Sequence, residues 1–172
     1  MGILYELKTR VMVQLYKHLP WISECWAKRH RFVESEEIPW ALLKKPLQET
    51  MIALVTTAGV HLKTQPPFDM DDPDGDPAFR VIPSDIETDE LTITHKYYDH
   101  SAADQDINVV LPLNRLRELR NKGVIGRIAP YVYGFMGHID GPNLKTLIKE
   151  TAPEVAHRLK QDGAEAVFLT PA

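Results

Sequence analysis

Short apolar runs alternate with amphipathic helical segments along most of this chain, and this alternation constrains the fold more than any other feature. Residues 51–57 and 166–170 are apolar and partly β-branched, as strands are. Residues 113–122 and 151–162 instead place apolar side chains at helical spacing. Strands that alternate with helices of about ten residues are typical of parallel βαβ units. We therefore expect an α/β fold, a layered, mostly parallel sheet with flanking helices that is incomplete at the C-terminus.

The last third of the chain carries the sharpest local signals. Residues 151–154 read TAPE, a capping box with proline in the first turn, which predicts a fresh helix after the helical stretch 142–150. Residues 166–170 are then expected to form a buried strand. Ligand crevices in open α/β sheets lie outside the carboxyl ends of the strands. Residues 59–61 and the residues after 170 both follow such strands, so we expect them to reach one crevice.

The first 45 residues differ from the rest in charge and pattern, which predicts a separate N-terminal amphipathic helical segment before a main domain at 46–172. Residues 1–31 carry a formal charge of +4, and the remainder carries −8. Apolar residues recur at helical spacing up to Leu19, Pro20 ends this helix, and a second helical stretch covers 21–32. Packing on its own domain is the ordinary role of such a helix. The alternative is a helix that lies on a membrane surface or a partner subunit.

Composition excludes several classes of protein. A net-acidic body without a lysine and arginine stripe gives no basis for nucleic-acid binding. Cys25 is the single cysteine, so an intrachain disulfide and a cysteine-based zinc site are excluded, and a buried structural thiol is expected. No apolar run approaches the ~18 residues of a membrane helix, and no signal peptide is recognisable. We expect a cytoplasmic protein without a transmembrane segment.

Two groups of metal-binding residue types do not match a known metal site. The proline-rich segment 65–83 contains the aspartates Asp69, Asp71, Asp72, Asp74 and Asp76. The EF-hand pattern fails, because its first and twelfth positions would fall on Met70 and Val81. We therefore expect a solvated or substrate-facing loop. His95, Asp99 and His100 also crowd one short segment, but their spacing matches no named metal-binding pattern, so no metal site is predicted.

Histidines beside glycines at the presumed strand ends are the candidate site residues. A glycine there lets the backbone approach a ligand, and a neighbouring histidine can donate a proton or orient a carboxylate. His61 and His138 are therefore the catalytic candidates. The substrate-binding candidates are Gly59, Asp99, His100 and Gly137. The alternative for each histidine is a turn residue that only bonds the backbone.

A series of short segments carries a family resemblance. Residues 53–61 read ALVTTAGVH, and the others follow in order: QPPFD at 65–69, GDP at 75–77, IPSD at 82–85, TH at 94–95, YDH at 98–100, DIN at 106–108, RLREL at 115–119, GVIG at 123–126, GFMG at 134–137 and ETAPEVA at 150–156. Together they resemble the selenoprotein B subunit family of the glycine, sarcosine, betaine and D-proline reductases. The resemblance covers about residues 51–172 and does not select a substrate.

This resemblance implies a reductase chemistry. In the family, the strand equivalent to 166–170 leads within a few residues into a selenocysteine or cysteine, then Cys-His-Arg and a new helix. The resemblance implies that the nucleophile lies beyond Ala172, after a UGA selenocysteine codon taken for a stop, and that the 172-residue chain is inactive alone. It also implies reductive cleavage of a C–N bond in an amino acid or betaine-like substrate. The implied cofactor, a pyruvoyl group, belongs to a companion reductase subunit rather than to this chain, and we expect an oligomer.

Two other functions stay open from the residues themselves. One is a non-catalytic α/β domain that ends at Ala172 by design and binds a small acid or a partner protein. The other, by analogy alone, is a racemase-like or lyase-like enzyme with a histidine base such as His61. The codon after Ala172 separates the reductase from the stand-alone domain, because UGA followed by an open frame favours the reductase.

Overall fold

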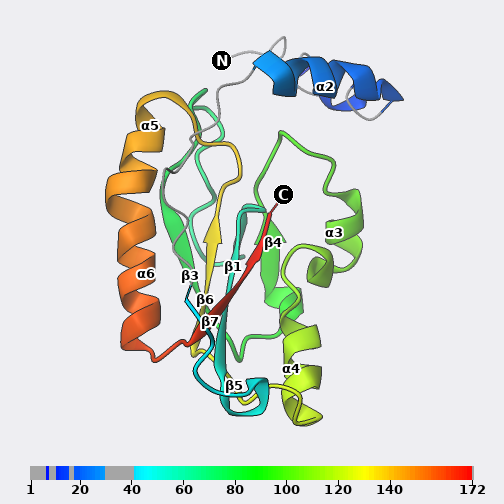
Figure 1. Ribbon diagram of the computed structural model, residues 1–172. Coiled ribbons are helices and arrows are strands. Elements are labelled where there is room, and N and C mark those ends of the chain that lie inside the picture. Colours follow the sequence, from blue (N-terminus) through cyan, green and yellow to red (C-terminus); the bar gives the residue numbers. More distant parts are fainter. Residues whose placement is uncertain (1–6, 8–10, 16–17, 30–40, 172) are drawn as a thin grey trace. The chain divides into compact units, whose positions relative to one another are not determined.

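The computed structural model describes residues 7, 11–15, 18–29 and 41–171 (Figure 1). The chain divides into two units, Met1–Leu42 with Lys96–Asp99, and Leu43–His95 with His100–Ala172. Of the predicted first helix, residues 7, 11–15 and 18 are helical, and the rest lies outside the described residues. Helix α2 (Pro20–Arg29) begins after Leu19. No helix in the described residues is long and apolar enough to cross a membrane.

The predicted burial of Cys25 is wrong, because this thiol is exposed on α2. Trp21, Cys25 and Lys28 recur at helical spacing and are all exposed, so they mark one solvent-facing side of the helix.

A mostly parallel sheet forms the centre of the second unit, as the alternating pattern predicts. The central strand β1 (Met51–Thr56) pairs in parallel with β5 (Arg127–Ile128) and β6 (Tyr131–Phe135) along one edge. Along its other edge β1 pairs in parallel with β7 (Ala166–Thr170). The outer strand β3 (Phe79–Pro83) is antiparallel to β6 and corrects the prediction that all of residues 65–83 form a loop.

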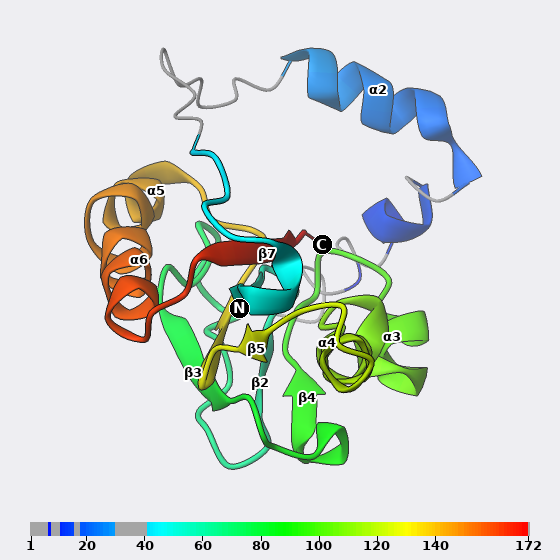
Figure 2. The same ribbon diagram turned by 60° about the horizontal axis from the view of Figure 1, so that its bottom comes forward.

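Helices cover both faces of this sheet, and Figures 1 and 2 show α5 and α6 on one side with α3 and α4 on the other. Their bounds are α3 (Ser101–Gln105), α4 (Leu113–Asn121), α5 (Gly141–Thr146) and α6 (Ala152–Gln161). Val155 and Leu159 of α6 share one core with Ala53 of β1 and Tyr133 of β6. Each fully buried aliphatic side chain of this kind contributes about 1.5–3 kcal/mol to folding. The predicted helix that ends near residue 162 and packs on the sheet is therefore confirmed.

The predicted capping box at residues 151–154 is wrong. Thr151 has helical backbone angles and makes no side-chain capping bond, because a π-helical turn, Leu147–Thr151, joins α5 to α6 without a break. Pro153 cannot donate a backbone hydrogen bond, and in an ordinary α-helix its ring crowds the carbonyl one turn earlier. A wider turn at this point accommodates the proline and keeps the chain helical.

A second, two-stranded antiparallel sheet consists of β2 (Val60–Leu62) and β4 (Leu91–Ile93). Gly134 lets β2 pass close to β6, because a Cβ atom at Gly134 would lie 2.1 Å from the carbonyl oxygen of Val60. Three 3₁₀ turns also belong to the unit: Leu47–Glu49, Thr88–Glu90 and η3 (Ile107–Val109).

Strand β7 is present as predicted, but the prediction that it is buried is wrong. Val167, Phe168 and Leu169 are 45%, 50% and 68% exposed. In the described chain β7 pairs with β1 alone, which makes it an edge strand. Side chains alternate between the two faces of a strand, so the exposure of three consecutive residues leaves both faces of β7 partly uncovered.

Candidate active site

The carboxyl ends of β1, β6 and β7 meet at one edge of the sheet, because these strands are parallel. The N–H of Thr57 donates to the carbonyl oxygen of Thr170 at 3.0 Å, and the N–H of Gly59 donates to that of Phe135 at 2.8 Å. The segment after β1 is thus bonded to the ends of both neighbouring strands. Gly59 and the end of β7 therefore lie at the same end of the sheet. That residues 59–61 and the residues after 170 reach one crevice stays a prediction, because Ala172 lies outside the described residues.

The chain leaves β1 and β6 towards opposite faces of the sheet, which opens a crevice between their ends. From β1 it passes into β2 and β3 and reaches β5 by way of β4, α3 and α4, whereas from β6 it passes directly into α5 and α6 (Figure 1). Ligands bind at such a topological switch point in open α/β sheets. A cavity of about 370 Å³ lies here, which we call the β1–β6 crevice. Its walls are formed by Val55, Thr57, Phe135, Met136, Gly137, Ile139, Leu147, Ile148 and Ala152.

Two threonines fix the strand ends beside this crevice. The hydroxyls of Thr56 and Thr170 both donate to the carbonyl oxygen of Val110, at 2.9 and 2.7 Å. Thr56 is fully buried, so its hydroxyl requires such a partner. The shared acceptor holds the ends of β1 and β7 together and therefore fixes where the chain leaves β7.

His95 lies beside Gly59 and is held in its neutral form. Gly59 has a φ of +72°, and a Cβ atom there would lie 2.4 Å from the carbonyl oxygen of Thr94 and 3.2 Å from Cβ of His95. Burial disfavours the charged imidazolium and lowers the pKa of His95 from 6.5 to about 4. The positive charges of His138 and His100 lower this pKa further.

His61, a predicted catalytic residue, is 3% exposed on β2 and is bonded through both ring nitrogens. Its Nδ1 lies 2.8 Å from the carbonyl oxygen of Leu62, and its Nε2 lies 2.8 Å from Oγ1 of Thr94. A carbonyl only accepts, so Nδ1 carries the proton and Nε2 accepts from the threonine hydroxyl. This arrangement matches the alternative role of a histidine that bonds the backbone.

The other predicted site residues lie in different places. His138 is half-buried, and its Nε2 donates to the carbonyl oxygen of Pro73 at 3.0 Å. His100 bonds Oδ2 of Asp104 at 2.8 Å through Nδ1. Gly137 is exposed and lines the β1–β6 crevice. Asp99 belongs to the first unit.

The aspartates of the acidic segment act as caps for their own backbone turns. Asp69 accepts from the N–H of Asp71, Asp72 from that of Asp74, and Asp76 from that of Ala78. Asn143 of α5 also donates to Asp72, which ties the segment to that helix. Among the described residues no cluster of histidine, cysteine, aspartate and glutamate is arranged to hold a metal ion.

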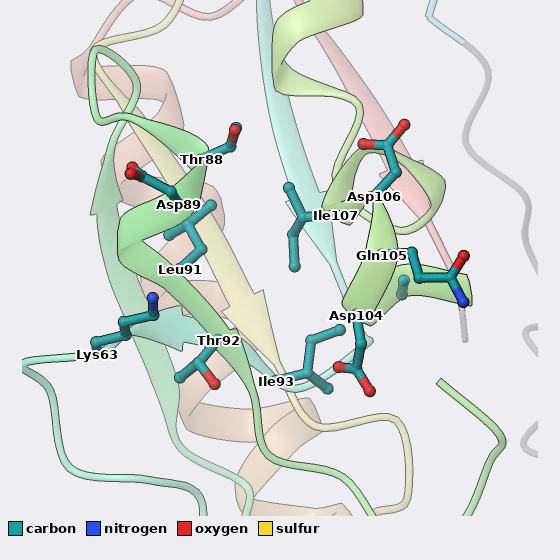
Figure 3. A pocket seen from close by; sticks show the side chains of 11 residues that line it. Lys63, Thr88, Asp89, Leu91, Thr92, Ile93, Asp104, Gln105, Asp106 and Ile107 are labelled. Atoms are coloured by element: carbon teal, nitrogen blue, oxygen red, sulfur yellow. The ribbon is translucent and has the colours of Figure 1, made fainter. Parts of the chain in front are cut away.

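A second cavity, of about 460 Å³, lies between β4 and the segment formed by α3 and η3 (Figure 3). Lys63 lines it on one side, and Asp104 and Asp106 line it on the other. Both acids already have partners, since Asp104 bonds His100 and Asp106 accepts from the side chain of Asn108, a bond that lowers the Asp106 pKa. None of its lining residues comes from β1, β6 or β7. The β1–β6 crevice is therefore the better candidate for the active site.

Sequence reasoning missed three features of the site. The first is the apolar crevice, which depends on where β1 and β6 end, and these strands are about 80 positions apart in the chain. The second is the carbonyl oxygen of Val110, which accepts from both Thr56 and Thr170 although it lies far from them in sequence. His95 was considered for metal binding alone. A usable signal was Pro153, because a proline inside a helical stretch marks a place where the backbone departs from regular α-helix.

Comparison with known proteins agrees with the motif resemblance. The family model for glycine/sarcosine/betaine reductase selenoprotein B matches residues 22–172. D-proline reductase subunit gamma of Acetoanaerobium sticklandii is 40% identical over 131 residues, which are 76% of this chain and 52% of that protein. Glycine reductase complex component B subunit gamma of Carboxydothermus hydrogenoformans is 32% identical over 73% of this chain and 29% of its own length. Betaine reductase complex component B subunit beta of Peptoclostridium acidaminophilum is 30% identical over 80% of this chain and 31% of its own length.

The chain thus spans about half the length of the first of these relatives and less than a third of the other two. No solved structure matches it significantly. A family match over residues 22–172, with relatives that are components of several amino acid and betaine reductases, supports one conclusion. The chain belongs to the glycine/sarcosine/betaine reductase selenoprotein B family.

Proposed function

We propose that this chain forms the N-terminal part of a reductase B-type subunit that reductively cleaves a C–N bond of an amino acid or betaine-like substrate. The observation that carries the proposal is the family match, combined with the position of β7, whose end is bonded to Thr57 beside the β1–β6 crevice. A nucleophile shortly beyond Ala172 would enter at this edge of the sheet. The relative with 40% identity is named for D-proline, so we place D-proline first among the substrates to assay.

The proposed chemistry needs a deprotonated chalcogen. A thiol with a pKa of ~8.5 is mostly protonated at neutral pH, and a selenol is more acidic, so a selenolate is the better nucleophile there. It attacks the α-carbon, a C–Se bond forms as the C–N bond breaks, and the nitrogen leaves with the bonding electron pair and takes up a proton. A dithiol reductant outside this chain would then supply the two electrons that release the reduced product and restore the selenolate. A pyruvoyl carbonyl on a companion subunit would make that nitrogen a better leaving group.

Residues of this chain would position the substrate and supply the proton. We place Gly59 and Gly137 where the backbone approaches the substrate, since they follow the ends of β1 and β6. His138 and His100 are the candidates for proton transfer to the leaving nitrogen. His95, neutral at physiological pH, would act as a positioning residue beside them. His61 would hold β2 in place through its two hydrogen bonds.

The proposal is tested by producing the protein in a host that inserts selenocysteine, together with its companion subunits. Release of amine or ammonia, or ring opening of D-proline, is then measured with each of four substrates: D-proline, glycine, sarcosine and betaine. We expect cleavage of at least one, abolished when the residue encoded by the UGA codon is replaced by serine. Cleavage that persists in the serine variant would contradict the proposal.

A further inference from the structure

The walls of the β1–β6 crevice are almost wholly hydrocarbon. Val55, Phe135 and Met136 are buried within it, and Ile148, 43% exposed, stands at its rim. None of the residues that line the crevice carries a charge, and Thr57 brings the single side-chain hydroxyl. A cavity of about 370 Å³ is within the usual range for a small-molecule site.

Such walls discriminate among small zwitterions by their carbon skeletons. A charged carboxylate or ammonium group loses its hydration in an apolar crevice without a compensating partner, so the charged ends of a ligand stay outside. Each methylene group that enters instead favours binding by about fourfold. Glycine has no side-chain or ring carbon to place there, sarcosine has one N-methyl carbon, and a ring-bearing amino acid has several.

The geometry of the mouth orients such a ligand. Thr57 belongs to the crevice wall, and its N–H is bonded to Thr170, the last residue of β7. A ligand whose hydrocarbon part fills the crevice therefore has its charged end at the edge of the sheet where the chain leaves β7. Gly137, which also lines the crevice, follows the end of β6 at the same edge.

We propose that the β1–β6 crevice binds the hydrocarbon part of the substrate and thereby selects a ring-bearing amino acid over glycine. This inference rests on the proposed reductase function, because it names the substrate class of that same site. The ring lies against Phe135, Met136 and the π-helical turn, and the α-carbon lies at the mouth. The wide π-helical turn contributes Leu147 and Ile148 to the wall, so its geometry sets the width of the crevice.

The test uses the full-length protein with its companion subunits and two probes that lack nitrogen and cannot be cleaved. Cyclopentanecarboxylate carries a five-membered ring, and acetate carries a single methyl group. Their dissociation constants are measured by calorimetry or by competition with the substrate. We expect cyclopentanecarboxylate to bind at least tenfold more tightly than acetate.

Variants assign this preference to the crevice. Ala152→Leu adds a bulky side chain to the crevice wall at an exposed position, and we expect it to reduce the ring preference at least fivefold. Ala156→Leu, one turn later on α6 and also exposed, lies outside the crevice wall and leaves the preference unchanged. Ile148→Asp places a charge at the rim and has the same effect as Ala152→Leu. Val124→Asp introduces the same charge at a site that is 42% exposed, and it is the control for Ile148→Asp.

The outcomes separate this inference from the proposed function. Equal binding of both probes, or a ring preference that survives Ala152→Leu and Ile148→Asp, overturns the crevice assignment even if the complex cleaves its substrate. A lower melting temperature for Ala152→Leu than for Ala156→Leu, with the ring preference intact, shows that the protein's own chain fills the crevice and also overturns it. A complex that prefers the ring probe but cleaves none of the four substrates contradicts the reductase function instead.

Discussion

The roles of individual residues near the carboxyl ends of the strands are not evident from the local sequence. His61 looks like a catalytic histidine because a glycine precedes it by two positions, but its Nε2 bonds Thr94, 33 positions away in the chain. The neutrality of His95 comes mainly from its burial, and to a smaller extent from His138, which folding brings close, and from His100. Partners distant in sequence decide both cases, so residue type and spacing predict where histidines cluster but not which of them are free to react.

The protonation of His95 gives a stability prediction. Its pKa in the folded protein, about 4, lies below the ordinary 6.5, so between these values the unfolded chain binds a proton that the folded chain does not. The free energy of unfolding therefore falls as the pH drops from 6.5 towards 4, by up to about 3 kcal/mol from this group. Urea denaturation at pH 7.5 and 4.5 should show a larger loss for the wild type than for His95→Gln. Equal losses would contradict the burial of a neutral His95.

Two glycines with nearly the same φ value allow the cost of backbone strain to be measured separately from the cost of a close contact. Gly59 and Gly123 have φ values of +72° and +69°, but a Cβ atom would meet the carbonyl oxygen of Thr94 at Gly59 and open space at Gly123. Gly123→Ala should cost about 1 kcal/mol from strain alone. Gly59→Ala should cost at least twice as much, because the backbone of residue 94 must also move. Chemical denaturation measures both, and equal costs would show that the segment around Gly59 is not packed as described.

At the scale of elements, periodicity predicts whether a segment forms a helix or a strand, and packing decides where that element lies. The strands at β1 and β7 and the helices at α4 and α6 are local patterns and form as predicted. The composition of β7 does not decide how exposed the strand is, because an apolar strand has the same composition whether or not a neighbour covers it. The capping box predicted at 151–154 was also a local pattern, but it does not form because the helix continues through the π-helical turn. Strand β3 was not predicted, because the prolines and aspartates around it are typical of a loop.

The open edge of β7 predicts the solution behaviour of the 172-residue chain. A strand that has one unpaired edge and exposed apolar side chains is a template for pairing with another chain. Leu169, 68% exposed, tolerates a charge, so Leu169→Lys should change the free energy of unfolding by less than about 0.5 kcal/mol. The same substitution should reduce self-association measured by analytical ultracentrifugation. Unchanged self-association in Leu169→Lys, with Val124→Lys as a surface control, would show that this edge is not the contact.

At the scale of the whole molecule, the exposed surface of β7 agrees with the family match. The chain spans about half the length of its D-proline reductase relative. Both faces of β7, the strand after which the proposed nucleophile would follow, are partly uncovered. Fold class was predictable because it follows from the order of elements, and the family from collinear short segments. The crevice was not, because it is made by the opposite departures of two adjacent strands, which a linear pattern does not encode.

The most direct measurement compares two lengths of the protein at equal concentration, each with the companion subunits. One ends at Ala172, and the other is expressed from the full gene in a host that inserts selenocysteine, so that translation can continue through the proposed UGA codon. Intact mass verifies both products. We predict substrate cleavage by the longer protein and none by the shorter, because the proposed selenolate lies beyond Ala172 and histidines alone supply only proton transfer. A product that still ends at Ala172 after expression in that host, or equal cleavage by the two lengths, would contradict the proposed reductase function.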